Sequence, residues 1–194
     1  MGKIFCLMGK SSSGKDTIFK EIIKDSSLDL DVIVSYTTRP KRIGETNGIE
    51  YYFVSNAELL EYKEKGKIIE ERVYNTVYGD WHYATVDDGR LDFNKSYLLI
   101  TTLEAYNSLK SYYGENMVKP IYVHVDDATR LERAIEREKQ QENPNYEEIC
   151  RRFLADSRDF SSDNLKKSGV NKFYVNNNLL DCINEIKEYI KSDL

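Results

Sequence analysis

The chain has 194 residues, an apolar fraction of 40%, and 28 Lys and Arg against 33 Asp and Glu, which gives a net charge of −5. This length fits one domain, and the apolar content argues against a disordered chain. The acidic balance argues against a protein that coats nucleic acid or an anionic membrane, so a bound anion must be held by a local cluster of donors. The three cysteines lie far apart without a CxxC pair, and the first apolar run is too short for a signal or membrane-spanning segment. We therefore expect a reduced, cytoplasmic protein.

Strands and helices alternate along most of the chain. Apolar and β-branched runs predict strands, and apolar residues at helical spacing predict helices. In chain order, the expected strands are 3–8, 31–37, 51–54, 68–74, 96–102, 120–125 and 172–176, and helices are expected at 17–24, 57–65, 103–113, 145–160 and 180–190. This alternation predicts an α/β fold with a parallel sheet. Residues 36–85 differ, because hairpin-like strands and polar turns there predict an inserted lobe.

A glycine-rich loop follows the first expected strand and reads GKSSSGK at residues 9–15. In such a loop successive backbone N–H groups point at one anion, while the helix N-terminus and a lysine add positive charge. The pattern GxxxxGK between a strand and a helix is typical of a nucleotide phosphate site. We expect that site to comprise Gly9, Lys10, Ser11, Ser12, Ser13, Gly14, Lys15, Asp16 and Thr17.

Asp16 departs from this pattern, which has Ser or Thr after the lysine as a magnesium ligand. A carboxylate is a stronger ligand for magnesium than a hydroxyl, but it also places negative charge beside the phosphates. Two interpretations stay open: Asp16 holds the metal, or it only stabilises the helix N-terminus through the helix dipole.

Residues 35–55, SYTTRPKRIGETNGIEYYFVS, resemble the monophosphate-binding lobe of guanylate kinases in Thr-Thr-Arg, Pro, Arg, Gly-Glu, Asn-Gly, and Tyr-x-Phe-Val-Ser. The resemblance implies a single guanylate-kinase-like domain over 1–194, with a three-layer P-loop NTPase core (1–35, 86–127, 160–194), an inserted monophosphate-binding lobe (36–85) and a helical lid (128–159). It also implies transfer of the γ-phosphoryl group of MgATP to a nucleoside monophosphate, with GMP as the expected acceptor. Partners would be nucleotides alone, without nucleic acid or membrane, and the chain would be a monomer or homodimer.

On the acceptor side, the resemblance implies that Arg39, Arg42, Tyr51 and Tyr78 hold the phosphate of GMP, as suits arginine forks that stay charged when desolvated. Glu70, after Ile68 and Ile69, and the hydroxyl of Ser35 would read the guanine base. A carboxylate can accept hydrogen bonds from both N1–H and the N2 amine of guanine. An ordinary solvated strand residue is the alternative for Glu70.

Two acceptor positions depart from the family pattern. Asp80 stands where the family has a hydroxyl, and an acid there would repel guanine O6 unless it were protonated or turned away. Ile100 and Thr102 stand where the family has acids that help to hold the metal and the acceptor. We expect Asp16 to approach the magnesium ion and to compensate partly for the missing acid.

On the donor side, the resemblance implies that Arg137 and Arg152 reach the transferring phosphates, and that Arg133 and Asn176 lie near the adenine of ATP. Positive charge would thus arrive as the lid closes. Lys15, Arg39, Arg137 and Arg152 are the expected catalytic residues. We expect Arg130, Arg151 and Arg158 to be solvated instead.

Two other functions stay open at this point. One is a kinase of the same build with another base preference, motivated by Asp80. The other is a catalytically silent protein-binding scaffold, which retention of Gly9, Gly14 and Lys15 disfavours, because scaffolds of this kind usually lose the phosphate loop. A P-loop hydrolase or switch is less consistent with two arginines suited to an acceptor phosphate.

Overall fold

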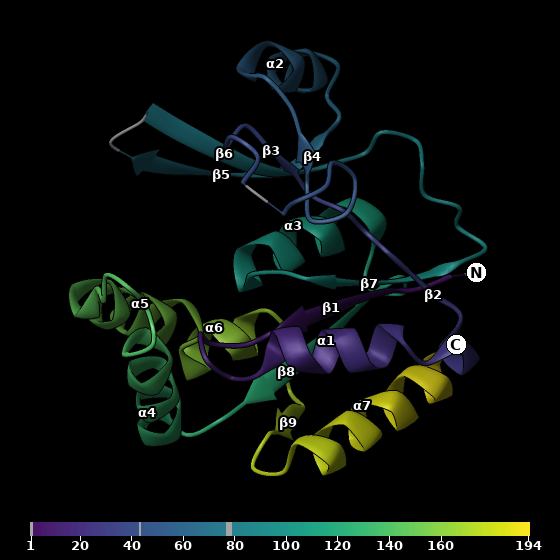
Figure 1. The fold of residues 1–194 in the computed structure, drawn as a ribbon. Helices are drawn as coiled ribbons and strands as arrows, with labels where there is room; N and C mark the ends of the chain where they lie inside the picture. The colour runs from purple at the N-terminus through teal and green to yellow at the C-terminus, as the bar shows by residue number, and fades with distance from the viewer. Residues whose placement is uncertain (1, 43, 77–78) are drawn as a thin grey trace.

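The computed structural model describes residues 2–42, 44–76 and 79–194 (Figure 1). A five-stranded sheet in the order β2-β7-β1-β8-β9 forms its centre. All neighbouring strands in this sheet run parallel, which confirms the predicted α/β class. The strands are β1 (Ile4–Met8), β2 (Leu30–Val32), β7 (Ser96–Ile100), β8 (Val118–His124) and β9 (Phe173–Val175).

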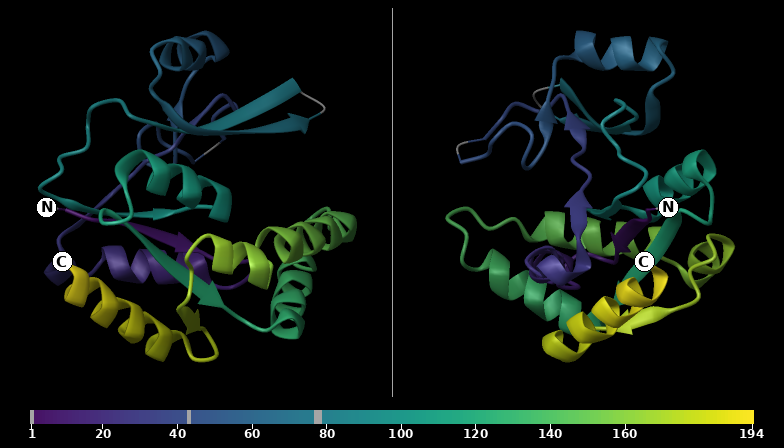
Figure 2. Two further views of the ribbon diagram at one scale, coloured as in Figure 1. Left: turned by 180° about the vertical axis from the view of Figure 1, so that it is seen from behind. Right: turned by 90° about the vertical axis from the view of Figure 1, so that its right-hand side faces the viewer.

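Helices cover both faces of this sheet, because successive side chains of β1 point to opposite faces. Phe5 and Leu7 pack in one buried cluster with residues of α1 (Lys15–Ile23) and α7 (Leu179–Asp193). Ile4, Cys6 and Met8 pack in the other with residues of α3 (Leu103–Tyr113) and α6 (Ser162–Lys167). The result is a three-layer core (Figure 2).

A second sheet, in the order β4-β3-β6-β5, forms a separate lobe over residues 36–86. Helix α2 (Asn56–Glu64) covers one face of it, where Leu59 packs against Tyr36, Ala84 and Val86. The other face looks toward the core, with α3 below it in Figure 1. The strands are β3 (Tyr36–Thr37), β4 (Tyr52–Phe53), β5 (Ile68–Thr76) and β6 (Gly79–Val86).

The prediction of one strand over 31–37 is wrong. The chain forms β2 in the core sheet up to Val32 and then crosses to the lobe, where β3 begins at Tyr36. The run DVIVSYT is β-branched and apolar throughout, so its composition fits either sheet and carries no sign of the crossing. The short helices η1 (Ser26–Leu28) and α6 also lie outside the predicted elements.

Helices α4 (Asp127–Glu138) and α5 (Tyr146–Asp159) form a hairpin beside the loop that follows β1 (Figure 1). We call residues 127–159 the lid. Asn145 caps α5, since its side chain accepts a hydrogen bond from the Glu148 N–H at 3.0 Å. Among the described residues, no helix combines the length and the apolar character needed to cross a membrane.

Candidate active site

The loop between β1 and α1 has a shape that two glycines make possible. A Cβ on Gly9 would lie 2.5 Å from the carbonyl oxygen of Val123, closer than side-chain atoms can approach. Gly14 has a φ of 89° as the N-cap of α1, and a Cβ there would lie 2.6 Å from the amide nitrogen of Asn176. Side chains at either position would therefore push the loop away from β8 or from Asn176.

Two serines give this loop unsatisfied polar atoms. Ser12 adopts a φ of 62°, a left-handed conformation that costs a non-glycine residue about 1 kcal/mol or more. The hydroxyls of Ser12 and Ser13 are buried, and no described group bonds to them. Buried hydroxyls without partners are costly, so the loop is arranged to receive polar groups from a ligand.

Lys15 lies at the start of α1, and its ammonium donates to the carbonyl oxygen of Lys10 at 3.2 Å. Burial lowers the pKa of Lys15, while the carboxylates of Asp16 and Asp156 act in the opposite direction. A cation held in a buried loop beside unpartnered hydroxyls is the expected arrangement for binding phosphates.

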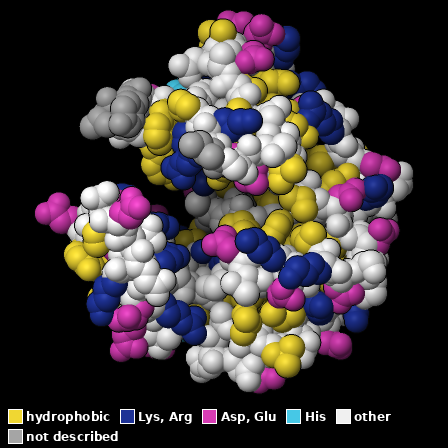
Figure 3. Space-filling model, in the orientation of Figure 1, with side chains coloured by type: hydrophobic (Ala, Val, Ile, Leu, Met, Phe, Trp, Pro, Cys, Tyr) yellow, Lys and Arg dark blue, Asp and Glu magenta, His cyan; other side chains and the backbone are white. Residues whose placement is uncertain are grey.

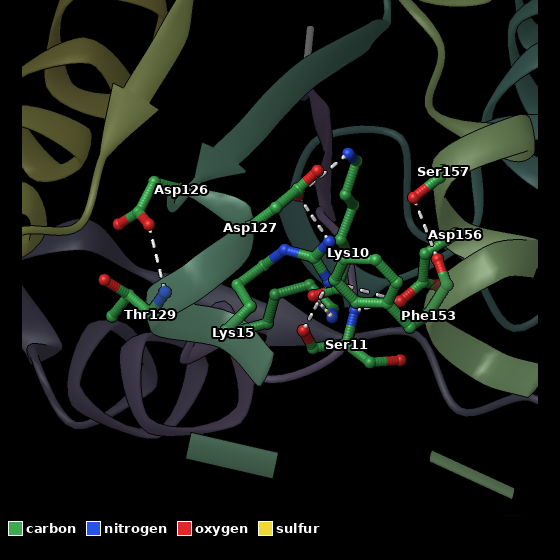
Figure 4. Close-up of polar contacts among 10 residues, drawn as sticks. Lys10, Ser11, Lys15, Asp126, Asp127, Thr129, Phe153, Asp156 and Ser157 are labelled. Atoms are coloured by element: carbon green, nitrogen blue, oxygen red, sulfur yellow. Dashed lines mark hydrogen bonds and ion pairs between the residues drawn. The ribbon is translucent and has the colours of Figure 1, made fainter. Parts of the chain in front are cut away.

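Contacts of the lid with this loop centre on Ser11, and Lys10 Nζ also donates to Asp127 Oδ1 of the lid at 3.2 Å (Figure 4). The Ser11 N–H donates to Asp156 Oδ2 at 2.6 Å, and its carbonyl oxygen accepts from Arg130 Nη1 at 3.1 Å. Its hydroxyl accepts from Arg152 Nη2 at 3.2 Å. One arginine expected at the transferring phosphates, Arg152, is therefore already at the loop.

The expectation that Arg130 is solvated is wrong, because its side chain is buried. It is 2% exposed, its Nη2 donates to Asp127 Oδ1 at 2.6 Å, and its guanidinium stacks over Phe153 at 4.9 Å. That bond lowers the pKa of the Asp127 carboxyl. Helix α4 carries three arginines spaced three and four residues apart, Arg130, Arg133 and Arg137. Of these, only Arg130 lies in the first turn of the helix, against the loop. Spacing alone could not separate it from the other two.

A cavity of about 270 Å³ opens beside the loop on the donor side. Exposed Arg133 and Arg137 line it from α4, together with Ser12, Gly14, Lys15, Asp16 and Thr17. The structure thus brings these predicted donor residues together. Asn176 lies behind the loop: it is 4% exposed and donates to the carbonyl oxygen of Ser13 at 2.9 Å, so it braces the loop.

A larger cleft of about 750 Å³, within the size range of ligand sites, runs from the loop to the lobe (Figure 3). The lid contributes Arg152, the end of β7 contributes Ile100 and Thr102, and the remaining lining includes Gly9, Ser11, Lys15, Ser35, Tyr51, Arg72, Tyr74, Trp81 and Tyr83. Of the predicted acceptor residues, Ser35, Tyr51 and Thr102 therefore share one space with Lys15, whereas Arg39, Arg42 and Glu70 are not in its lining. Thr102 lines it while capping α3, through a bond from the Ala105 N–H at 3.2 Å.

Arg39 is already engaged in the lobe. It is 4% exposed, and its Nη1 and Nη2 donate to the two carboxylate oxygens of Glu45 at 3.0 and 2.7 Å. This pairing raises the pKa of Arg39 and lowers that of Glu45. A carboxylate thus occupies the arginine fork that a phosphate monoester would occupy.

The other predicted acceptor-phosphate residues differ in their surroundings. Tyr51 lies under the Arg39 guanidinium at 5.6 Å and lines the cleft, and burial raises its pKa, which keeps the phenol a neutral donor. Arg42 is exposed, and its backbone N–H donates to Glu45 at 2.7 Å. Tyr78 lies outside the described residues.

Glu70 is not a solvated strand residue, since it is 7% exposed. Its carboxylate accepts from Arg72 Nε at 3.0 Å, from Arg72 Nη2 at 3.4 Å and from the Thr85 hydroxyl at 2.8 Å. The cross-strand pairs Glu70–Thr85, Arg72–Tyr83 and Tyr74–Trp81 place these side chains on the face of the β5–β6 hairpin that lines the cleft.

Asp80 lies on the opposite face of that hairpin, with Glu71, His82 and Ala84. Its carboxylate is exposed and accepts from the Asn75 side-chain amide at 2.6 Å. The structure therefore does not bring Asp80 to the cleft, and it places Arg72 there, which sequence reasoning missed. Alternation along 68–86 was the available signal, but using it requires knowing which face points inward.

Asp16 and the end of β7 are not brought together either. Asp16 is exposed and lines the donor-side cavity, whereas Ile100 and Thr102 line the cleft. Lys15 lines both spaces. This arrangement gives no support to the expectation that Asp16 replaces an acid at Ile100 or Thr102.

Comparisons with known proteins agree on one family. The guanylate kinase family model matches residues 1–193. The guanylate kinase of Mycoplasma mobile is 30% identical over 100% of this chain and 94% of its own, and that of Porphyromonas gingivalis is 26% identical over 98% and 97%. The crystal structure of guanylate kinase from Anaplasma phagocytophilum, at 20% identity, superposes with a TM-score of 0.67 over 99% of this chain and 86% of that one, which shows a common fold.

Proposed function

Because the chain belongs to the guanylate kinase family, we propose that it transfers the γ-phosphoryl group of MgATP to GMP, giving ADP and GDP. One observation carries this proposal: the cleft that begins at Lys15 and Ser11 of the phosphate loop ends at Ser35, just before the lobe, and at Tyr51 within it. A donor and an acceptor bound at these two ends would face one another in a single space.

The reaction needs positioning and charge more than it needs a nucleophilic side chain. A phosphate oxygen of GMP attacks the γ-phosphorus of ATP, and the bond from that phosphorus to the oxygen bridging to the β-phosphate breaks, so that ADP leaves. Lys15 would stabilise the charge that develops on the transferring group. Arg39 and Tyr51 would hold the attacking phosphate, and Glu45 would yield the Arg39 fork to it.

The lid would supply further positive charge and exclude water. Arg152 already touches Ser11 at the phosphate loop, and Arg137 lines the donor-side cavity. Both would contact the transferring phosphates when the lid closes. Arg133, in the same cavity, would lie near the nucleoside of ATP, while Asn176 would act on the donor by bracing Ser13.

The residues present fit a magnesium ion that arrives with ATP. Magnesium usually binds through one or two carboxylates together with substrate phosphates and water. Asp16 is an exposed carboxylate beside Lys15, and no described side chain forms a hydrogen bond or an ion pair with it. We assign Asp16 as its protein ligand, direct or through water. The ion would neutralise charge on the β- and γ-phosphates.

The scaffold alternative is less consistent with these features. A protein that only displays a binding surface has no need of a left-handed serine, buried unpartnered hydroxyls and a half-buried lysine in one loop. A cytoplasmic location, a monomeric or dimeric state and the absence of nucleic acid partners stay predictions.

A coupled assay of ADP formation with GMP, dGMP, AMP, CMP and UMP tests the proposal. We expect turnover with GMP to exceed turnover with AMP, CMP and UMP by at least about tenfold. A base that leaves polar groups of the site without hydrogen-bond partners costs more than about 1 kcal/mol of binding. Preference for another monophosphate would identify a kinase of different base specificity. No ADP formation with any acceptor would favour the scaffold.

A further inference from the structure

Arg72 is the cation on the cleft-facing side of β5. Its side chain is 24% exposed, whereas the side chain of Glu70, to which it is bound, is 4% exposed. It lines the cleft with Tyr74, Trp81 and Tyr83. Glu70 is absent from that lining, so a molecule in the cleft meets Arg72 before it meets the carboxylate.

The pairing with Glu70 also fixes which edge of Arg72 points outward. Nε and Nη2 both donate to the Glu70 carboxylate, at 3.0 and 3.4 Å. No described residue accepts a hydrogen bond from Nη1. A guanidinium is planar, so once two nitrogens are held on one side, the third presents its N–H groups in a set direction.

The hydrogen-bond count at Glu70 limits what the carboxylate can do alone. Its two oxygens offer about four acceptor positions. Arg72 and Thr85 occupy three of them. One position remains, so Glu70 can accept from one guanine donor in this arrangement and not from N1–H and the N2 amine together.

Guanine also presents an acceptor edge, formed by O6 and N7, and arginine is the side chain best suited to that edge. The hydroxyl that the family pattern has after Tyr-Gly is replaced by Asp80, which faces away from the cleft. We propose that Arg72 is a specificity-determining residue for the acceptor base, with Nη1 donating to O6 of guanine while Nε and Nη2 keep Glu70 in place.

This role, which rests on the proposed function, predicts a clear direction of selectivity. Adenine has an amino group where guanine has O6. With adenine bound, this amino group and Arg72 Nη1 would both be hydrogen-bond donors, and Nη1 would have no acceptor. Guanine satisfies both Arg72 and the free position of Glu70. The neighbouring rings of Tyr74, Trp81 and Tyr83 provide apolar surface for the base plane.

The test compares GMP with 6-thio-GMP, in which sulfur, a weak acceptor, replaces O6. Binding of each ligand is measured by titration calorimetry without ATP, on the wild-type chain, Arg72→Met and Arg72→Lys. Arg90→Met is the matched control, because Arg90 lies over the ring of Tyr52 at 4.4 Å, outside the cleft lining.

We expect the wild-type chain to prefer GMP over 6-thio-GMP by about tenfold, and Arg72→Met to lose most of that preference through weaker GMP binding. Arg90→Met should keep the wild-type ratio. Equal weakening of both ligands in Arg72→Met would mean that Arg72 contacts the phosphate or only supports the lobe, and an unchanged ratio would mean that O6 is read elsewhere. Either result overturns the inference.

Arg72→Lys covers the case in which Arg72→Met does not fold. Lysine keeps a positive charge beside Glu70 but lacks the planar fork, so its GMP preference should fall below half of the wild-type value, and a full preference would contradict the role. Turnover separates this inference from the proposed function. A wild-type chain that phosphorylates GMP but does not distinguish 6-thio-GMP refutes only the inference, whereas no turnover with any monophosphate refutes the function.

Discussion

The donor and acceptor ends of the cleft are built in different ways. At the donor end, the phosphate loop supplies Lys15 and the unpartnered hydroxyls of Ser12 and Ser13, and Arg133 and Arg137 of the lid stay exposed, although Asp156 already accepts from the Ser11 N–H. At the acceptor end, the key arginines are already paired, Arg39 with Glu45 and Arg72 with Glu70. The donor end therefore offers open positions for a polyanion, whereas the acceptor end must exchange existing ion pairs for ligand contacts.

This difference indicates which part of the cleft determines affinity for the donor phosphates and which part determines selectivity for the acceptor. An open loop binds any triphosphate of the correct geometry, because backbone donors do not read a base. A preformed arginine–carboxylate pair presents hydrogen-bond donors and acceptors in a fixed pattern. Only a ligand with complementary acceptors and donors therefore binds it well. We expect selectivity to be carried mainly by the lobe.

Lys15→Ala should have the largest effect of the single changes, because it removes the half-buried charge that would lie nearest the transferring phosphate. We expect turnover to fall by at least about 10³-fold, equivalent to about 4 kcal/mol of barrier, with the fold retained. Steady-state rates and circular dichroism measure both. Lys20→Ala, an exposed change in the same helix, is the control, and near-normal activity of Lys15→Ala would remove the basis of the donor assignment.

Arg39→Ala tests the opposite end. Loss of the buried fork should raise the KM for GMP by roughly 10- to 100-fold and leave the KM for ATP within about twofold, because a charged hydrogen-bonded contact is worth about 1.5–3 kcal/mol. Initial rates at varied GMP and varied ATP separate the two constants. Lys41→Ala, an exposed neighbour, should change neither. A larger effect on ATP than on GMP would contradict the division of the cleft.

The variant Asp16→Ser tests whether the Asp16 carboxylate binds magnesium at the donor end. If the carboxylate holds magnesium, the variant needs several-fold more magnesium for half-maximal rate, because a hydroxyl is the weaker ligand. A magnesium titration at fixed ATP measures the shift, and Glu21→Gln, farther along α1, serves as the control. Tighter ATP binding at unchanged magnesium demand would show that Asp16 is only a repulsive charge beside the phosphates.

Asp80→Ser should have the smallest effect, although the sequence singled this residue out. Its carboxylate faces away from the cleft, so we expect the GMP-to-AMP selectivity to change by less than about twofold, as for most surface substitutions. Glu70→Gln, on the inner face, should lower GMP turnover selectively in the same assay. A marked gain in GMP turnover for Asp80→Ser would place the carboxylate near the base after all.

The sequence was most informative where local chemistry decides the structure. The phosphate loop depends on adjacent residues, and helix 103–113 has the predicted bounds because its apolar spacing and flanking residues agree. The acceptor side depends on which face of a hairpin points inward, and a shift of one residue exchanges the faces. Asp80 and Arg72 could therefore not be assigned before the cross-strand pairs were known. Arg130 was missed because its burial depends on a loop 119 residues away in the chain.

The three hydrogen bonds between Ser11 and the lid also limit how early the active site can form while the chain is being synthesised. The partners of Ser11 lie 119, 141 and 145 residues farther along the chain. At about 5–20 residues per second, the ribosome takes roughly 7 to 30 s to reach Asp156 after it has made Ser11. The phosphate loop emerges first, yet it cannot make its bonds to the lid until most of the chain has followed, so an N-terminal fragment would carry the complete loop motif without the contacts that hold Ser11.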